Sequence, residues 1–359
     1  MYETSVCNYS TVQEAFLYEL NNVVTYGETI EVRGSKVKEI LNRTIVIREP
    51  WKRCLIVHGR NDNIFAKIAE TLWMIAGRDD LDWLARYVPR VYDYSDDGCR
   101  WRGAYGPRIR KWTGGHPYYT DQLMNVVDLL VADPNTRRAV ISIWDPSIDV
   151  VDGLDIPCNN WLHFYIRGDK LHLNVAQRSS DILWGLSGID VFQWSVLMDV
   201  VAAMVGVKVG WLTYFISNLH LYDKHWVRAD KILNDRREYD YLYDYNVTSP
   251  QPSKEYFLDD LERVFAWEES FRDNRWCNAC DDPRDEFLAA CVGMLRAYNI
   301  FLNKRDGYID SLASCVSNMN KCDFKFAAIE YFHRNIGYEF LKELFLNPDE
   351  RKIVENLCK

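Results

Sequence analysis

The chain has no excess of positive charge and no long, uninterrupted apolar run. Its 359 residues carry 43 lysines and arginines against 52 aspartates and glutamates, which gives a net charge of -9. A general nucleic-acid binder presents a basic surface, so this balance argues against one, although a few converging arginines would suffice for a small phosphorylated ligand. The most apolar stretch, residues 196–207, is interrupted by Asp199 and is too short to span a bilayer.

Cysteines are too few for a disulfide framework. The chain has 10 of them in 359 residues, which is unlike the dense pattern of small secreted domains. Its first residues contain no basic segment followed by an apolar run, which predicts no signal peptide. Cys277 and Cys280 form one close pair, but a structural zinc site usually needs two, so ordinary thiols are favoured. We expect a cytoplasmic protein with no metal, no membrane segment and no nucleic-acid partner.

The apolar residues that are present suffice for a sizeable core, since they make up 48% of the chain. Periodicity predicts helices over 12–26, 63–77, 80–85, 120–132, 191–205 and 219–234, and strands over 29–48, 138–144, 161–166, 171–177 and 209–218. Residues 89–118, rich in Arg, Tyr, Gly and Pro, predict an ordered loop. From residue 255 onward helical spacing dominates. We predict an α/β (α+β) core at 1–236, then a linker and helical extension at 237–359 packed on the core.

Three segments carry residues suited to chemistry. Cys158 follows a proline, a run from Gln177 to Asp181 begins nineteen residues later, and His220 precedes Tyr222 by two positions. A thiol beside an arginine can be held as thiolate, the nucleophile that adds to electron-poor carbon. In this order the segments resemble the core of thymidylate synthases, which carry a Pro-Cys nucleophile, an Arg-Ser-x-Asp segment and a His-x-Tyr pair.

The resemblance continues upstream and covers roughly residues 12–226. Twin arginines at 137 and 138 precede a predicted strand, as in that family. Glu70 lies in a segment similar to the family's Glu-Leu-Leu-Trp helix, Tyr105 in one similar to its Tyr-Gly loop, and Arg33 in one similar to its N-terminal phosphate loop. The family's fold, a mixed sheet flanked by helices, is therefore expected here.

The resemblance also implies a reaction. C5 of a pyrimidine is too weak a nucleophile to attack a one-carbon electrophile, and a thiolate that adds at C6 turns C5 into an enolate-like carbanion. Cys158 would be that thiolate, the substrate a nucleoside monophosphate, and the one-carbon donor 5,10-methylenetetrahydrofolate. The implied catalytic residues are Cys158, Glu70 as a proton relay through water, Asp181 as an anchor for the folate pterin, and Tyr105. The implied substrate-binding residues are Arg33, Arg137, Arg138, Arg178 and Ser179 at the phosphate, Asp190 at the base, and His220 and Tyr222 at the sugar.

Simpler structural roles are open for several of these residues. Cys158 could be a small buried apolar residue, Glu70 a surface partner along its helix, and Asp181 a helix cap. Single arginines are often solvated surface charges. In the resembled family the twin arginines reach into the neighbouring subunit's site, which implies a homodimer in which Arg137 and Arg138 are shared.

The base-reading position departs from the family. Thymidylate synthases carry there an Asn that bonds N3 and O4 of uracil. Asp190 takes its place if one residue is inserted, whereas an alignment without a gap gives Ile189, which could not read a base edge. A carboxylate accepts from the N4 amine of cytosine and repels O4 of uracil. Because N3 of cytosine is itself an acceptor, Asp190 and N3 would share one proton. Alternatively, Asp190 only caps a helix that starts at Val191.

Family members with Asp at this position are similar to cytidylate hydroxymethylases, in which water captures the exocyclic methylene intermediate. Asn159 also departs from the family, which usually has His after the nucleophile. We therefore predict folate-dependent 5-hydroxymethylation of CMP or dCMP. The alternative is methylation, as in thymidylate synthases, or hydroxymethylation of dUMP. A third possibility is a non-catalytic protein that keeps the fold to bind nucleotide or RNA.

Overall fold

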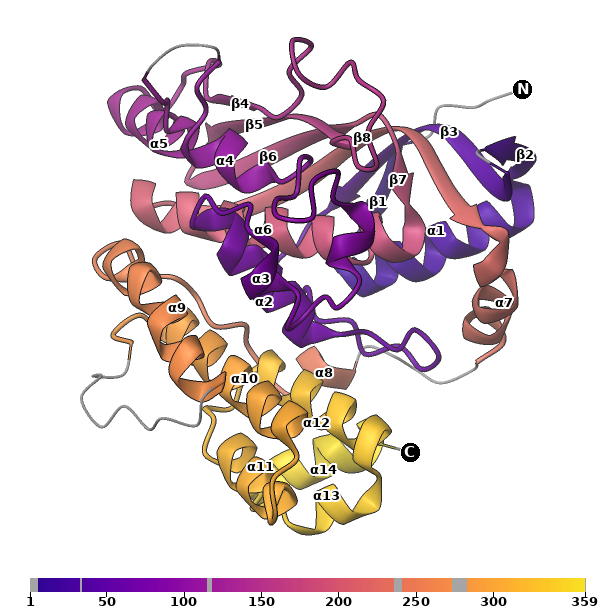
Figure 1. Ribbon diagram of the computed structural model, residues 1–359, viewed down its shortest axis with the longest axis vertical. Helices are drawn as coiled ribbons and strands as arrows, with labels where there is room; N and C mark the ends of the chain where they lie inside the picture. The colour runs from indigo at the N-terminus through magenta and orange to yellow at the C-terminus, as the bar shows by residue number, and fades with distance from the viewer. Residues whose placement is uncertain (1–5, 33, 115–117, 236–240, 273–282, 359) are drawn as a thin grey trace. The chain divides into compact units, whose positions relative to one another are not determined.

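The computed structural model describes residues 6–32, 34–114, 118–235, 241–272 and 283–358 (Figure 1). The chain divides into two compact units. The first comprises Met1–Arg53 and Ala69–Asp235, and the second Cys54–Ile68 and Arg236–Lys359. Residues 54–68, which we assigned to the core on sequence, therefore belong with the helical extension. That the extension packs on the core stays a prediction.

A mixed sheet of eight strands forms the first unit, with the order β1-β3-β8-β6-β5-β4, β2 on β3 and β7 on β8. Its strands are β1 (Val6–Tyr9), β2 (Glu28–Val32), β3 (Ser35–Ile47), β4 (Val140–Ser142), β5 (Asn159–Arg167), β6 (Lys170–Gln177), β7 (Ser180–Asp181) and β8 (Lys208–Tyr222). Strands β6 and β7 pair parallel with β8, whereas β3 pairs antiparallel with it. The long β8 thus links both halves of the sheet, and this architecture confirms the predicted fold class.

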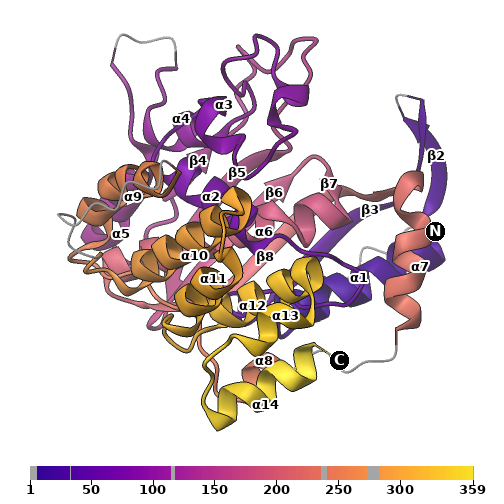
Figure 2. The ribbon, with the colours of Figure 1, turned by 60° about the horizontal axis from the view of Figure 1, so that its bottom comes forward.

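The described helices up to residue 235 are α1 (Val12–Tyr26), α2 (Ile64–Ile75), α3 (Leu81–Leu84), α4 (Tyr105–Arg110), α5 (Gln122–Ala132), α6 (Ile189–Val205) and α7 (Trp226–Asn234). Of these, α1, α4, α5 and α6 contact the strands of the sheet. Helix α6 is apolar on all sides and nearly every residue in it is buried, so it is the central core helix. Helix α5 lies at the β4 end of the sheet and α7 at the β2 end (Figures 1 and 2).

One helical segment, Ile182–Val205, is long and apolar enough to cross a membrane, contrary to our estimate from residues 196–207. It combines α6 with a preceding π-helix, Ile182–Leu186. Of its most apolar window, 83% is buried inside the protein. Burial of this extent is typical of a core helix.

A hairpin places the nucleophile region beside the arginine segment. Strands β5 and β6 pair from Arg167 opposite Lys170 to Asn159 opposite Gln177. Gly168 in the connecting turn has φ +63°, a conformation that favours glycine. Cys158 directly precedes Asn159 and Arg178 directly follows Gln177, so the two residues flank the same end of the hairpin. This register brings together two of the three motif segments.

The second unit is helical. Its described helices are α8 (Tyr241–Asp244), α9 (Phe257–Arg272), α10 (Glu286–Asn303), α11 (Tyr308–Ser317), α12 (Asp323–Ile336), α13 (Tyr338–Lys342) and α14 (Pro348–Leu357). Phe65 stacks on Tyr298 with ring centroids 4.7 Å apart and lies 5.0 Å from Phe332, which ties residues 54–68 to this unit. Lys325 and Glu350 form a buried ion pair at 2.8 Å. The predicted helical character after residue 255 is confirmed.

Two local predictions were wrong. Residues 89–118 contain the helix α4 as well as loop. Residues 219–222, expected to begin a helix, continue strand β8, because Leu219 pairs with Ile40 of β3 and with Ser180 of β7. Long-range pairing of this kind overrides local helical spacing. It also places His220 and Tyr222 on a strand.

Candidate active site

Cys158 lies just before β5 and is half-buried, with Arg178 beside it. The Arg178 guanidinium donates hydrogen bonds to the carbonyl oxygens of Pro157 (2.9 Å) and Ile156 (2.8 Å). Burial raises the pKa of the Cys158 thiol to about 11, and the positive charge of Arg178 opposes this shift. The thiolate expected from the sequence is therefore not the resting form of the ligand-free protein. Arg178 is positioned to stabilise the negative charge when the sulfur loses its proton.

Asn159 is fully buried at the centre of a hydrogen-bonded network. Its Oδ1 accepts from Gln177 Nε2 at 3.0 Å and from Trp194 Nε1 at 3.1 Å. Its Nδ2 must then point the other way, and it donates to the Tyr105 hydroxyl oxygen at 2.7 Å. Because that oxygen accepts from Asn159, the hydroxyl hydrogen of Tyr105 is left to donate elsewhere.

Asp190 lies in the first turn of α6 and is buried. The helix begins at Ile189 after Gly188, and no side-chain cap is formed there, so Asp190 does not cap it. Its Oδ2 accepts from Gln177 Nε2 at 2.8 Å. Burial raises the pKa of Asp190 to about 6, while hydrogen bonds from Asn159 and Gln177 oppose the shift. Asp190 therefore belongs to the network around Asn159.

The π-helix before α6 lies in the segment where the alignment of Asp190 with the family's Asn requires one inserted residue. Over Ile182–Leu186 the chain takes a wider turn, in which the backbone N–H of Ser187 donates to the carbonyl of Ile182, five residues back, at 3.2 Å. Such turns accommodate one extra residue within a helical segment. That Asp190 rather than Ile189 occupies the base-reading position, as in the gapped alignment, stays a prediction.

Glu70 projects from α2 and has few polar partners. Gln193 Nε2 donates to its Oε1 at a long 3.4 Å. Burial raises the pKa of Glu70 to about 8, and the negative charges of Asp190 and Asp155 add to this effect. A surface glutamate paired along its helix would have no such shift, so the environment is that of a proton-holding carboxyl group.

Asp181 is both a cap and a candidate ligand. Its Oδ1 accepts from the backbone N–H groups of Leu183 (2.7 Å) and Trp184 (2.9 Å), which confirms the cap interpretation. Its Oδ2 is buried and has no hydrogen-bond partner among the described residues. Next to it across β7 and β8 lies His220, whose pKa is lowered by burial. Ser179 Oγ lies 3.4 Å from His220 Nδ1, and Tyr222 packs edge-on against the His220 ring at 5.2 Å.

The proposed phosphate-binding arginines are not brought together within the described chain. Arg178 lies beside Cys158, whereas Arg137 and Arg138 are exposed ahead of β4, at the edge of the sheet. Arg33 lies outside the described residues, as do Cys277 and Cys280. Among the residues that the structure does describe, no group of three or more His, Cys, Asp or Glu side chains could hold a metal ion.

Sequence reasoning missed Gln177 and Asp155. Gln177 was read only as part of a motif, yet it joins Asn159 to Asp190. Asp155 lies three residues before Cys158, and its Oδ2 accepts from Trp101 Nε1 at 2.6 Å. No periodic pattern marks either residue, because both roles depend on contacts made in the folded chain. The one available signal was the short distance in sequence between Asp155 and the nucleophile.

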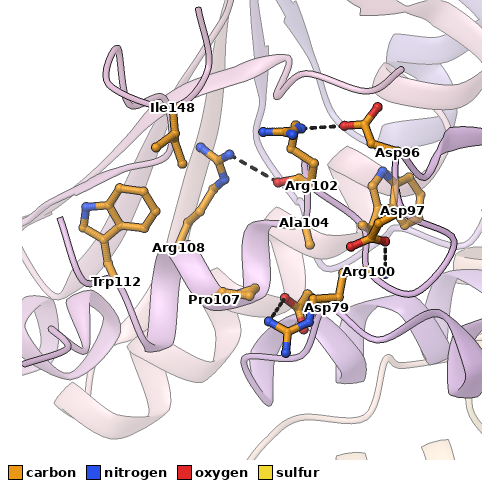
Figure 3. A pocket seen from close by; sticks show the side chains of 11 residues that line it. Asp79, Asp96, Asp97, Arg100, Arg102, Ala104, Pro107, Arg108, Trp112 and Ile148 are labelled. Atoms are coloured by element: carbon orange, nitrogen blue, oxygen red, sulfur yellow. Dashed lines mark hydrogen bonds and ion pairs between the residues drawn. The ribbon is translucent and has the colours of Figure 1, made fainter. Parts of the chain in front are cut away.

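A cavity of about 330 Å³ lies beside Trp101 and opens among charged side chains of the 79–112 region (Figure 3). Arg108 crosses its wall and makes a buried bidentate ion pair with Asp149, with both nitrogen–oxygen distances at 2.7 Å. Arg102 pairs with Asp96 on another side. Because these guanidinium groups already have carboxylate partners, they hold the loop together.

The residues around Asp181 fit a pterin-bearing cosubstrate. The unpartnered Oδ2 of Asp181 can accept from a ring N–H group, and a buried acceptor without a donor is costly. Trp184, three residues on, is 60% exposed and offers an aromatic surface. The chain thus supplies one acceptor and one flat apolar contact on the same segment.

Comparisons with known proteins agree with this geometry. The family model described as Thymidylate synthase matches residues 14–262. The chain is similar to proteins named deoxyuridylate hydroxymethyltransferase from three phages. That of Bacillus phage SP01 is 29% identical, over 93% of this chain and 95% of the relative. That of Delftia phage PhiW-14 is 31% identical over 64% and 65%, and that of Pseudomonas phage M6 is 37% identical over 50% and 51%. This chain belongs to the thymidylate synthase family, whose members transfer a one-carbon unit from methylenetetrahydrofolate to a nucleotide.

Proposed function

We propose that the protein hydroxymethylates C5 of deoxyuridine monophosphate. Hydroxymethylation of dUMP, which was the alternative from the sequence, is thus preferred over the CMP or dCMP substrate predicted first. Support comes from the relative named deoxyuridylate hydroxymethyltransferase, which aligns over 93% of this chain. The observation that carries the proposal is the buried Asp190 carboxylate in the network behind Cys158.

Uracil suits this carboxylate at neutral pH. With a pKa raised to about 6, Asp190 is mostly ionised at pH 7 and accepts directly from the N3–H of uracil. Cytosine has an acceptor at N3 and would need one further proton. The hydroxyl hydrogen of Tyr105, directed away from Asn159, is a candidate donor to O4 of uracil. Together they would supply one acceptor and one donor for the uracil edge.

The remaining residues have complementary roles in the proposal. Cys158 Sγ adds to C6, and Arg178 stabilises the developing thiolate charge. Glu70, which keeps its proton near neutral pH, exchanges protons with the base through water. 5,10-Methylenetetrahydrofolate supplies the one-carbon unit when it is bound. The substrate-binding residues are assigned as follows: Arg33, Arg137, Arg138, Arg178 and Ser179 to the phosphate, His220 and Tyr222 to the sugar, and Asp181 to the pterin.

We also propose that the protein is a homodimer whose twin arginines serve the partner's site. Arg137 and Arg138 are exposed at the sheet edge, away from Arg178. The sheet face opposite α6 exposes large aromatic side chains: Trp161 (37%), Trp211 (49%) and Phe215 (41%). An apolar sheet face of this kind is suited to burial against a second copy.

A second candidate substrate is a cytidine monophosphate. Asp190 favours it in one respect, because a pKa raised to about 6 allows the carboxyl group to share a proton with N3 of cytosine. Incubation with methylenetetrahydrofolate and dUMP, dCMP or CMP in parallel, followed by mass spectrometry, tests both. A hydroxymethylated dUMP is expected. Product from dCMP or CMP alone would identify a cytidine monophosphate as the substrate. A methylated dUMP would identify a thymidylate-synthase activity.

A further inference from the structure

Asp155 is a carboxylate three residues before Cys158 that the proposed reaction has not yet used. Trp101 Nε1 donates to its Oδ2 at 2.6 Å. Gly103 leaves the space that the carboxylate occupies, since a Cβ built on Gly103 would lie 2.1 Å from the same oxygen. Any side chain at position 103 would therefore displace Asp155. One donor and one glycine thus fix this carboxylate in place.

The segment that carries Asp155 is held on both sides. The backbone N–H of Leu154 donates to Asp96 Oδ1 at 3.0 Å. The carbonyl oxygens of Ile156 and Pro157 accept from the Arg178 guanidinium. Asp155 therefore keeps a fixed position relative to Cys158, as a group that transfers a proton must.

The charge on Asp155 acts on the interior of the site. It raises the pKa values of Glu70, Tyr105 and Asp190, which come from three different helices, and of Cys158, which lies just before β5. Burial raises the pKa of Asp155 itself, while the Trp101 hydrogen bond and the charges of Arg178 and Arg108 oppose that shift. Among the residues that the structure describes, Gln193 is the one side chain that donates to Glu70, at a long 3.4 Å. Asp155 is consequently the more readily ionised of the two.

Hydroxymethylation needs a proton acceptor at its last stage. Once the exocyclic methylene group has formed, Cys158 is bonded to C6, Asp190 is assigned to the base, and Glu70 holds its proton. Asp181 is occupied as a helix cap through Oδ1. The acceptor for the proton of the attacking water has to be a further group, and a carboxylate with donors on one side is suited to that task.

We infer that Asp155 is the general base for the water that captures the exocyclic methylene group, an assignment that rests on the proposed hydroxymethyltransferase function. The water oxygen forms a bond to the methylene carbon, and one water proton passes to the Asp155 carboxylate. The electron pair of the C5=CH2 bond moves to the C4 oxygen as an enolate. Collapse of the enolate restores the C5=C6 double bond and expels Cys158 as thiolate, which can take the proton back.

Asp155→Asn tests this step, because the amide oxygen can still accept from Trp101 but the side chain cannot take a proton. With dUMP tritiated at C5, tritium release in the first turnover reports the steps up to methylene formation. We expect the variant to keep the wild-type rate of first-turnover release. Formation of hydroxymethyl product should fall about 100-fold. Intact-protein mass spectrometry should then detect the nucleotide covalently bound through the methylene stage.

Asp96→Asn is the matched control, since Asp96 holds the same segment through Leu154. It should leave tritium release coupled to product formation. If both variants released tritium without forming hydroxymethyl product, Asp155 would only hold the loop, and the assignment would be overturned. Equal losses of tritium release and product in Asp155→Asn, or no loss at all, would also overturn it while leaving the proposed function intact. A wild-type protein that releases tritium without forming hydroxymethyl product would overturn both.

Discussion

Gln177 Nε2 donates hydrogen bonds to Asp190 Oδ2 at 2.8 Å and to Asn159 Oδ1 at 3.0 Å. Gln177 is the last residue of β6, whereas Asp190 lies in the first turn of α6. One amide nitrogen thus links the sheet to the core helix at Asp190, the residue that we propose reads the base. The other amide atom, Oε1, is buried without a hydrogen-bond partner in the described part of the chain. The orientation of the Asp190 side chain is therefore set by the sheet.

Replacing Asp190 with Asn should move the enzyme's preference away from uracil. The Asn oxygen can accept from Gln177 as Asp190 does, and its NH2 group would then face the N3–H donor of uracil, whereas N3 of cytosine could accept from it. We expect the ratio of kcat/KM for dUMP to that for dCMP to fall about 5- to 150-fold, which corresponds to about 1–3 kcal/mol. Parallel assays of both nucleotides measure it. Asp169→Asn, in the exposed β5–β6 turn, is the control, and an unchanged ratio in Asp190→Asn would limit Asp190 to a structural role.

Replacing Cys158 with Ser should abolish turnover and preserve nucleotide binding. A serine hydroxyl is a far weaker nucleophile than a thiolate, and none of the assigned phosphate contacts involves this side chain. We expect kcat to fall at least about 1000-fold while the Kd for dUMP, measured by calorimetry, changes less than about threefold. Retention of more than a few per cent of the activity would show that another residue attacks C6.

Replacing Glu70 with Gln should stabilise the protein as it slows the reaction. Burial raises the pKa of Glu70 from 4.5 to about 8, so the folded state retains a proton that the unfolded state releases between these pH values. Wild-type stability is thus lost as pH rises through this window. The Gln side chain does not titrate, so the variant does not lose this stability. Its free energy of unfolding should exceed that of the wild type by on the order of 3 kcal/mol at pH 7 and should not differ from it below pH 4.5. Its kcat should fall about 100-fold.

Urea unfolding curves at pH 4, 5.5, 7 and 8 measure the stability difference for Glu70→Gln. Glu49→Gln is a suitable control, since Glu49 is a surface partner of Lys52 at 2.9 Å. It should shift the curves little at any pH. A Glu70→Gln protein whose stability matches the wild type at pH 8 would contradict a proton-holding Glu70.

Local signals explain why much of the fold could be predicted from the sequence. The helix predicted over 12–26 is present as Val12–Tyr26, and Thr11 caps it by accepting from the backbone N–H of Glu14. Strands β5 and β6 follow from alternation and from the turn at Gly168. These features depend on residues close together in the chain, so a sequence pattern can record them.

The missed features depend on residues far apart in the chain. Arg108 and Asp149 form a buried pair across 41 positions, and Trp101 reaches Asp155 across 54. Neither carboxylate stands in a pattern that marks its partner. Similarly, residues 219–222 have helical spacing, but pairing with β3 and β7 makes them a strand. Motif resemblance singled out Cys158, whereas the partners of Asp149 and Asp155 emerged only from the folded geometry.

Dimerisation through the exposed sheet face can be tested by introducing a charge there. Trp161 and Phe215 share that face, with ring centroids 6.3 Å apart. We expect Phe215→Asp to give a monomer in sedimentation experiments, because an ionised carboxylate would have to be buried in the interface. The Lys208–Asp169 ion pair lies at the exposed end of the same strands. Lys208→Asp is therefore a matched control that should remain dimeric.

Shared arginines predict that two inactive variants restore activity when mixed. A protein with Arg137→Glu and Arg138→Glu would lack the phosphate contacts it supplies to its partner, and Cys158→Ser would lack the nucleophile. In a mixed dimer, one site receives wild-type arginines from the Cys158→Ser subunit and keeps its own Cys158. Random reassociation makes half of the dimers mixed, so about a quarter of the wild-type activity should return. If the mixture stayed inactive while mixed dimers were detected by native mass spectrometry, the twin arginines would have to act within their own subunit.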